Sequence, residues 1–189
     1  STNTSVERVA ADINSVKELT GVEASAVTKI ELFNLENAGT MSMTLLGNKP
    51  VTGLESGFGK AISAEIADKS DLNPLVRAIN AVAAHTGITA TIGATAASVI
   101  LTHSGGEDIE ITSFDAGADT TDTMNVRVLD KFGNNMSTAD TTMFRTLQAN
   151  SDDVDTIGNA SLAYQAVGQL TLTSVKSFVV ENDHATVGN

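Results

Sequence analysis

The 189-residue chain contains no cysteine and no tryptophan, and aromatic residues make up only 4% of it. The absence of cysteine excludes disulfide bonds, thiol catalysis and thiolate metal ligands, and it leaves the redox compartment undetermined. Hydrophobic residues nevertheless make up 41% of the chain. We therefore expect a core built from Val, Ile, Leu, Ala and Met.

Basic residues are also scarce. The chain has 11 basic and 23 acidic residues, which gives a formal net charge of -12. An acidic field repels nucleic acid and anionic membrane surfaces, so we expect neither as a partner. There is no cluster of Lys and Arg interleaved with aromatic residues, and no apolar run is long enough to span a bilayer.

One pattern occurs twice along the chain, in residues 9–24 and 75–90, and the two copies align without a gap. Each copy holds an Ile-Asn pair followed by a Thr-Gly pair. Apolar residues recur at helical spacing before each Thr-Gly and alternate after it, which predicts an amphipathic helix, a glycine stop and a half-buried strand. The helical stripes are Val6, Val9, Ile13 and Val16 in the first copy, and Leu72, Leu75, Val76, Ile79 and Val82 in the second. We predict helices near 5–19 and 72–85.

Asn14 and Asn80 lie late in the two predicted helices. Asparagine side chains near helix ends bond to local backbone or to a neighbouring strand. We predict a structural role for both residues.

The rest of the chain has the alternation of β-strands. We expect one hairpin from 29–35 and 40–46, and another from 99–102 and 109–113 around a turn at 103–108. Further strands are expected at 60–67, 124–129 and 143–147, and a pair at 169–173 and 177–181. The predicted fold class is α+β and β-dominant, with two helix–Gly–strand repeat units, β-hairpins and a β-rich C-terminal third. Residues 1–57 and 58–115 hold the two units; within 116–189, the end (about 165–189) is expected to pack on the first unit. The sequence is compatible with one core shared by the two units or with two domains. It is also compatible with a separate inserted lobe at 116–165.

Candidate chemical groups are few. His85, His103 and His184 do not have metal-ligand spacing. His103, Glu107 and Asp108 could meet in one turn, although a solvated turn is the favoured interpretation. The loop 115–122 carries Asp115, Asp119 and Asp122, and the run 151–155 carries three more carboxylates. Calcium prefers such loops, but neither has EF-hand spacing, so we favour solvated loops.

Other motifs carry little weight. Gly105-Gly106 and the loop Gly53–Gly59 lack the phosphate-binding pattern and are expected to be turns. Asn3, Asn135 and Asn159 match the N-glycosylation sequon, as chance predicts in a chain rich in Asn, Ser and Thr. No Gly-x-Ser-x-Gly is present. We predict no catalytic, cofactor or metal site, and hence no enzyme, because an enzyme needs a cleft where reactive groups converge.

The second copy, residues 75–90, followed by Ile100-Leu101-Thr102-His103-Ser104-Gly105-Gly106-Glu107-Asp108-Ile109, resembles the IN motif of bacterial flagellins. This motif lies in the outer, variable region of flagellins and of some hook-associated proteins. The first copy matches through Ala24 and then diverges. Residues 167–174 and 178–180 are similar to a strand pair near the end of the same outer region. The resemblance covers somewhat over half of the chain.

The resemblance implies a structural protein: the solvent-facing outer domain of a flagellar filament subunit, secreted and extracellular, with a role in motility. Flagellins polymerise through long terminal helices, which are absent from this chain, so contacts with other flagellin subunits are expected through those segments and a monomer is expected here. Surface Ser and Thr are expected as O-glycan sites, and Ser1 and Asn189 at the same end of the molecule. The alternatives are the outer domain of a hook-associated or cap protein, or an adhesin-like binding module, which would need an exposed apolar or aromatic patch.

Overall fold

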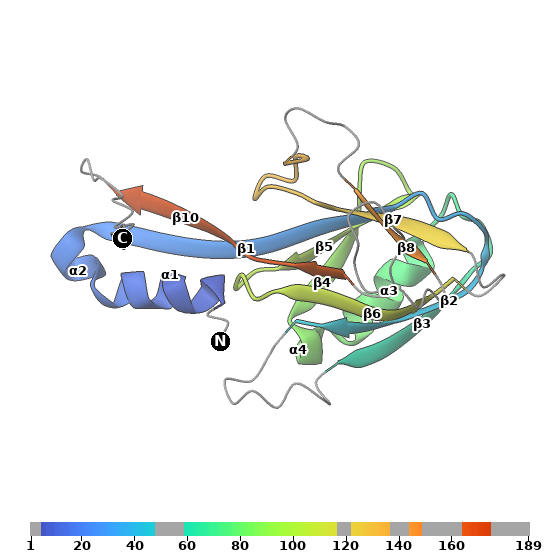
Figure 1. Cartoon of the computed structure of the whole chain (residues 1–189), viewed down its shortest axis with the longest axis horizontal. Coiled ribbons are helices and arrows are strands. Elements are labelled where there is room, and N and C mark those ends of the chain that lie inside the picture. Colours follow the sequence, from blue (N-terminus) through green and yellow to red (C-terminus); the bar gives the residue numbers. More distant parts are fainter. Residues whose placement is uncertain (1–4, 48–58, 117–121, 137–143, 149–163, 175–189) are drawn as a thin grey trace, which may run out of the picture.

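The computed structural model describes residues 5–47, 59–116, 122–136, 144–148 and 164–174 (Figure 1). The fold is β-dominant, with 50% strand and 20% helix, and its sheets are antiparallel. The predicted β-dominant character is therefore confirmed. Among the described residues, no helix is both long enough and apolar enough to cross a membrane.

Four short helices and ten strands are described. In chain order they are α1 (Val6–Ser15), α2 (Lys17–Thr20), β1 (Val22–Phe33), β2 (Gly39–Leu46), β3 (Lys60–Ile66), α3 (Asn73–Ala81), α4 (Ala83–Thr86), β4 (Ile88–Ile92), β5 (Ser98–His103), β6 (Ile109–Asp115), β7 (Thr123–Val128), β8 (Arg145–Gln148), β9 (Tyr164–Ala166) and β10 (Gln169–Ser174). Most lie within a few residues of the predicted ranges. The predicted strand 177–181 lies outside the described residues.

The strands form two sheets. One has the order β4-β5-β1-β7-β8, with β10 also paired to β1, and the other has the order β3-β2-β6-β9. Each sheet contains strands from residues 1–57, 58–115 and 116–189. The sequence segments are therefore interleaved in space around one core.

Both predicted hairpins are wrong. β1 pairs with β5, β7 and β10, whereas β2 pairs with β3 and β6. Likewise β5 belongs to the first sheet and β6 to the second. The segments 34–38 and 104–108 carry the chain from one sheet to the other, and Leu35 is buried on the way. Because facing sheets lie about 10 Å apart, connections of this length suffice to cross between them.

The core fills the space between the sheets. Its fully buried members come from nearly every strand of the two sheets and include Ile30, Leu32, Met43, Leu45, Leu101, Ile111, Phe114, Val126 and Leu147. Helix α3 closes one open side, because it packs against β4 of one sheet and β3 of the other. Its residues Leu75 and Ile79, and Leu72 just before it, are buried completely or nearly so.

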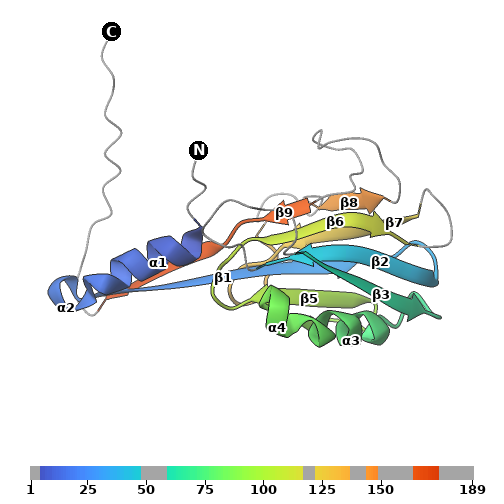
Figure 2. The same ribbon diagram turned by 90° about the horizontal axis from the view of Figure 1, so that it is seen from below.

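An extension, which we call the arm, consists of α1, α2, residues Val22–Val27 of β1, and β10. Helix α1 packs on β1 and touches β10, and Figures 1 and 2 show it at the opposite end of the molecule from β2 and β3. Strand β1 continues from the arm into the body. It pairs with β10 from Val22 to Val27 and with β5 from Thr28 to Phe33. Ser1 and Asn189 lie outside the described residues.

Candidate functional site

Both amphipathic helices end in the same way. Val16 and Val82 leave helical geometry, with φ of -110° and -107°, and a single further turn, α2 or α4, follows. Gly21 and Gly87 then each have a φ of 69°. A residue with a Cβ is strained at that angle, so glycine is required where each helix turns into its strand.

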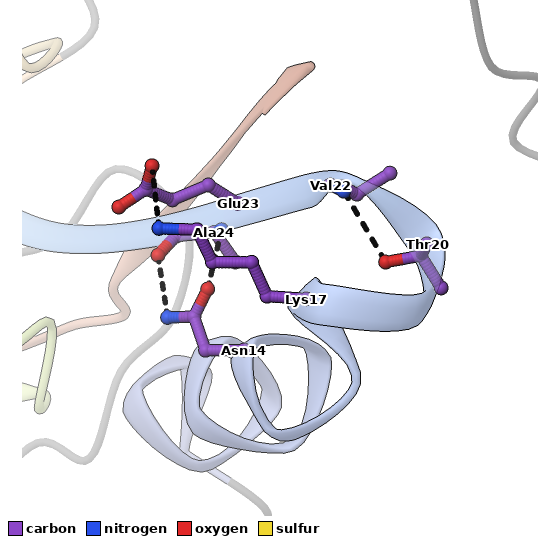
Figure 3. A network of polar contacts seen from close by, with 6 residues as sticks. All are labelled: Asn14, Lys17, Thr20, Val22, Glu23 and Ala24. Carbon is purple, nitrogen blue, oxygen red and sulfur yellow. Dashed lines mark hydrogen bonds and ion pairs between the residues drawn. The ribbon is translucent and has the colours of Figure 1, made fainter. Parts of the chain in front are cut away.

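The two asparagines hold helix and strand together at these junctions. Asn14 Nδ2 donates to the Ala24 carbonyl at 2.8 Å, and Asn14 Oδ1 accepts from the Ala24 N–H at 2.8 Å (Figure 3). Asn80 makes the same two bonds with Ala90, at 2.9 and 2.8 Å. The predicted structural role of both side chains is confirmed, and the bonding is across to the strand.

Neighbouring residues support each junction. The Thr20 and Thr86 hydroxyls accept from the second backbone N–H beyond them, each at 3.2 Å. Lys17 and Glu23 add an ion pair of 3.1 Å at the first junction (Figure 3). Both side chains are largely exposed, so this pair contributes little.

Within the described residues, the turn 103–108 is the one place where residues singled out for chemistry meet. The expected solvated turn is wrong, because His103 and Asp108 are buried, at 6% and 5% exposure. His103 Nδ1 accepts from the Glu107 N–H at 3.2 Å, and the Thr28 hydroxyl donates to the Glu107 carbonyl at 2.6 Å. Asp108 accepts from Gln165 Nε2 at 2.7 Å.

The same turn receives the N-terminal end of α1. The Ser5 hydroxyl, which caps the helix, donates to Glu107 Oε1 at 3.0 Å. Gly106 has a φ of 80°, and a Cβ there would lie 2.3 Å from the Cβ of Ala26. Only glycine allows the turn to approach β1 this closely. The turn is therefore the anchor between the arm and the body.

Burial shifts the titration of two groups in the turn. Burial raises the pKa of Glu107, and the hydrogen bond and charge of Glu7 raise it further, against smaller opposing effects of Ser5 and His103. Burial lowers the pKa of His103, while the charge of Glu107 partly offsets this effect. Low dielectric disfavours the charged form of each group. Glu107 therefore retains its proton to higher pH, and His103 loses its proton at lower pH, than the same groups do in water.

The remaining candidates are dispersed. Asp115 is exposed at the end of β6, Asp122 is buried and accepts from Asn37 Nδ2 at 2.7 Å, and Asp119 lies outside the described residues. His85 is exposed on α4. Among the described residues, no three His, Asp or Glu side chains form a group that could hold a metal ion.

Several further candidates fall outside the part of the chain that the structure describes. These are His184, the carboxylates of 151–155, Gly53, and the sequon residues Asn3 and Asn159. The third sequon residue, Asn135, forms a β-bridge with Leu129.

Sequence reasoning missed one buried charge. Glu31 is 5% exposed although it alternates with core residues along β1. Arg127 Nε donates to Glu31 Oε2 at 2.7 Å, and the Arg127 guanidinium lies 4.6 Å from the centre of the Phe33 ring. A carboxylate between Ile30 and Leu32, two core residues of β1, was the available signal that a cation on a neighbouring strand covers it.

Comparison with protein-family models and with curated proteins finds no match for this chain.

Proposed function

We propose that the chain is the solvent-facing outer domain of a bacterial flagellar filament subunit, and that residues 6–26 and 72–92 are two copies of one folding unit. The observation that carries the proposal is the repeated junction. Asn14 and Asn80 make equivalent bonds, and Gly21 and Gly87 have the same φ. The Ile-Asn and Thr-Gly pairs that resemble the flagellin motif thus have a physical reason to occur together.

The surface supports a structural role. The net charge of -12 keeps neighbouring domains apart by mutual repulsion, which salt screens. The polar groups of the buried turn at 103–108 are bonded within the fold, since His103 and Thr28 bond to the Glu107 backbone and Ser5 bonds to the Glu107 side chain. In this proposal the domain decorates the filament and contributes surface properties such as solubility and recognition.

The test is immunogold labelling of intact source cells with antibodies raised against the chain. The proposal predicts label along the whole filament, and deletion of the domain from its parent is expected to leave filament assembly intact. Label confined to the filament tip or to the hook junction would favour a hook-associated or cap protein. Label on the cell body alone would contradict the filament proposal and favour an adhesin-like module.

One observation favours the binding alternative. Leu19 and Phe132 are large apolar side chains that are 89% and 77% exposed. Leu19 lies in α2 and Phe132 lies in the segment after β7, so they provide apolar area for a partner at two separate places. The labelling pattern separates this function from the filament role.

A further inference from the structure

The two amphipathic helices carry equivalent apolar stripes, but the stripe of the first helix is less completely covered than that of the second. In the second helix region, Leu72, Leu75 and Ile79 are between 0% and 1% exposed. Their counterparts Val6, Val9 and Ile13 are only half-buried.

The difference continues past the helix break. Val16 is 45% exposed, whereas its counterpart Val82 is half-buried. We define the α1 stripe as Val6, Val9, Ile13 and Val16.

The molecule itself shows what covers such a stripe. β3 packs along α3 and turns Ile62, Ala64 and Ile66 inward, all of them buried. It pairs with β2, and Gly47, just after β2, lies against Thr86 at the end of α4. In the described part of the chain, no strand packs along α1 as β3 packs along α3, and β2 and β3 lie far from the arm (Figures 1 and 2).

We propose that the α1 stripe is a docking surface for a β-strand of another polypeptide, which lies along α1 as β3 lies along α3. The surface is continuous with the established interface between α1 and β1. The inference rests on the internal repeat alone and does not depend on the filament proposal.

The dimensions fit a short strand. Val6 and Val16 are separated along a helix by about 15 Å at 1.5 Å per residue. A strand of about five residues spans a similar length at ~3.3 Å per residue. The buried positions of β3 run from Ile62 to Ile66 and are of this size. The expected occupant therefore carries apolar side chains at two or three alternate positions.

Charge selects among possible occupants. The whole chain carries a net charge of -12, so a second copy is repelled. The complementary partner carries basic residues flanking its apolar positions.

The experiment titrates the full chain, with methyl-labelled Val, Leu and Ile, with a synthetic peptide of residues 60–66 extended by two lysines at each end. We expect saturable NMR shifts at Val6, Val9 and Ile13. A peptide with both isoleucines replaced by serine is the matched control and is expected to leave these methyl signals unchanged.

Two variants of the chain test the surface. Ile13→Asp and Val16→Asp are each expected to weaken binding at least tenfold. Val16→Asp changes a side chain that is already 45% exposed, so it preserves folding if Ile13→Asp does not. Thr173→Asp, an exposed position of β10, is the control and is expected to bind like the parent.

Three results would overturn the proposal. The first is an absence of shifts at the stripe, and the second is shifts confined to α3, which would mean that the peptide displaces β3. The third is concentration-dependent dimerisation of the chain alone in sedimentation, abolished by Val16→Asp. In that case a second copy is the occupant.

Discussion

Replacement of Asn80 by alanine tests the most distinctive local feature of the fold. Asn80 satisfies both backbone groups of Ala90, which is 4% exposed, through bonds of 2.9 and 2.8 Å. Each hydrogen bond contributes about 1 kcal/mol, and a buried backbone group left without a partner costs about 1–3 kcal/mol. Alanine regains roughly 0.5 kcal/mol of helix propensity. We expect Asn80→Ala to lower the free energy of unfolding by about 2 kcal/mol.

Urea denaturation followed by circular dichroism measures this loss. With a denaturant slope of about 2 kcal/mol/M, the midpoint is expected to fall by roughly 1 M urea while the slope stays constant. A change of less than about 0.5 kcal/mol would refute the reasoning, because that is the scatter of an ordinary surface substitution.

Asn14→Ala is the matched control, because it removes two bonds of the same length from Ala24. These bonds hold the arm, where α1 has only one buried residue, Ala10. We expect amide exchange in α1 to accelerate about 30-fold, the equivalent of about 2 kcal/mol, while the urea midpoint of the body hardly changes. An equal loss of global stability in both variants would contradict the distinction between arm and body.

Three further outcomes follow from burial and charge. Ile79→Ala is expected to lower the unfolding free energy by about 2–5 kcal/mol and Ile13→Ala by clearly less, because Ile79 is buried and Ile13 is not; equal urea midpoints would contradict this. Arg127→Met leaves Glu31 buried without its cation and is expected to cost about 3 kcal/mol in the same assay; a neutral effect would contradict the ion pair. The pKa of Glu107 is raised in the folded state, so the folded state binds more protons than the unfolded state near that pKa. Protonated Glu107 therefore stabilises the fold at low pH. This stabilisation is lost as the pH rises from the unfolded pKa of 4.5 through the folded pKa. Glu107→Gln is therefore expected to reduce the loss of α1 exchange protection between pH 4.5 and pH 7, and an unchanged pH profile would exclude Glu107 as its source.

The local elements were predictable because their signals are local. The helices, their glycine stops and most strands follow from spacing, and Gly21 and Gly87 end the helical segments where the pattern breaks. Strand pairing was not predictable in the same way. Alternation on β1 and β2 identifies the buried face of each strand. Two strands can bury those faces in the same core either as neighbours in one sheet or as members of two facing sheets. The conformation of the segment 34–38 decides between them.

In the candidate site, too, the local features were predictable from the sequence and the tertiary contacts were not. The adjacency of His103 and Glu107 was visible in the sequence, whereas Ser5 and Glu7 come from a helix about a hundred positions away. Their approach depends on Gly106 fitting against Ala26, a tertiary contact that no local pattern encodes. Charged and glycine-rich residues therefore indicated a solvated turn, and the structure places an anchor there.

Strand β1 also has a mechanical consequence. Its 12 residues span about 40 Å, and the exchange of partners from β10 to β5 falls between Val27 and Thr28. The Thr28 side chain is tied to the Glu107 carbonyl at this point, so the strand is held where it would otherwise hinge. A force applied near Gly21 is transmitted along the continuous backbone of β1 into the sheet of the body. We therefore expect the arm to resist bending relative to the body.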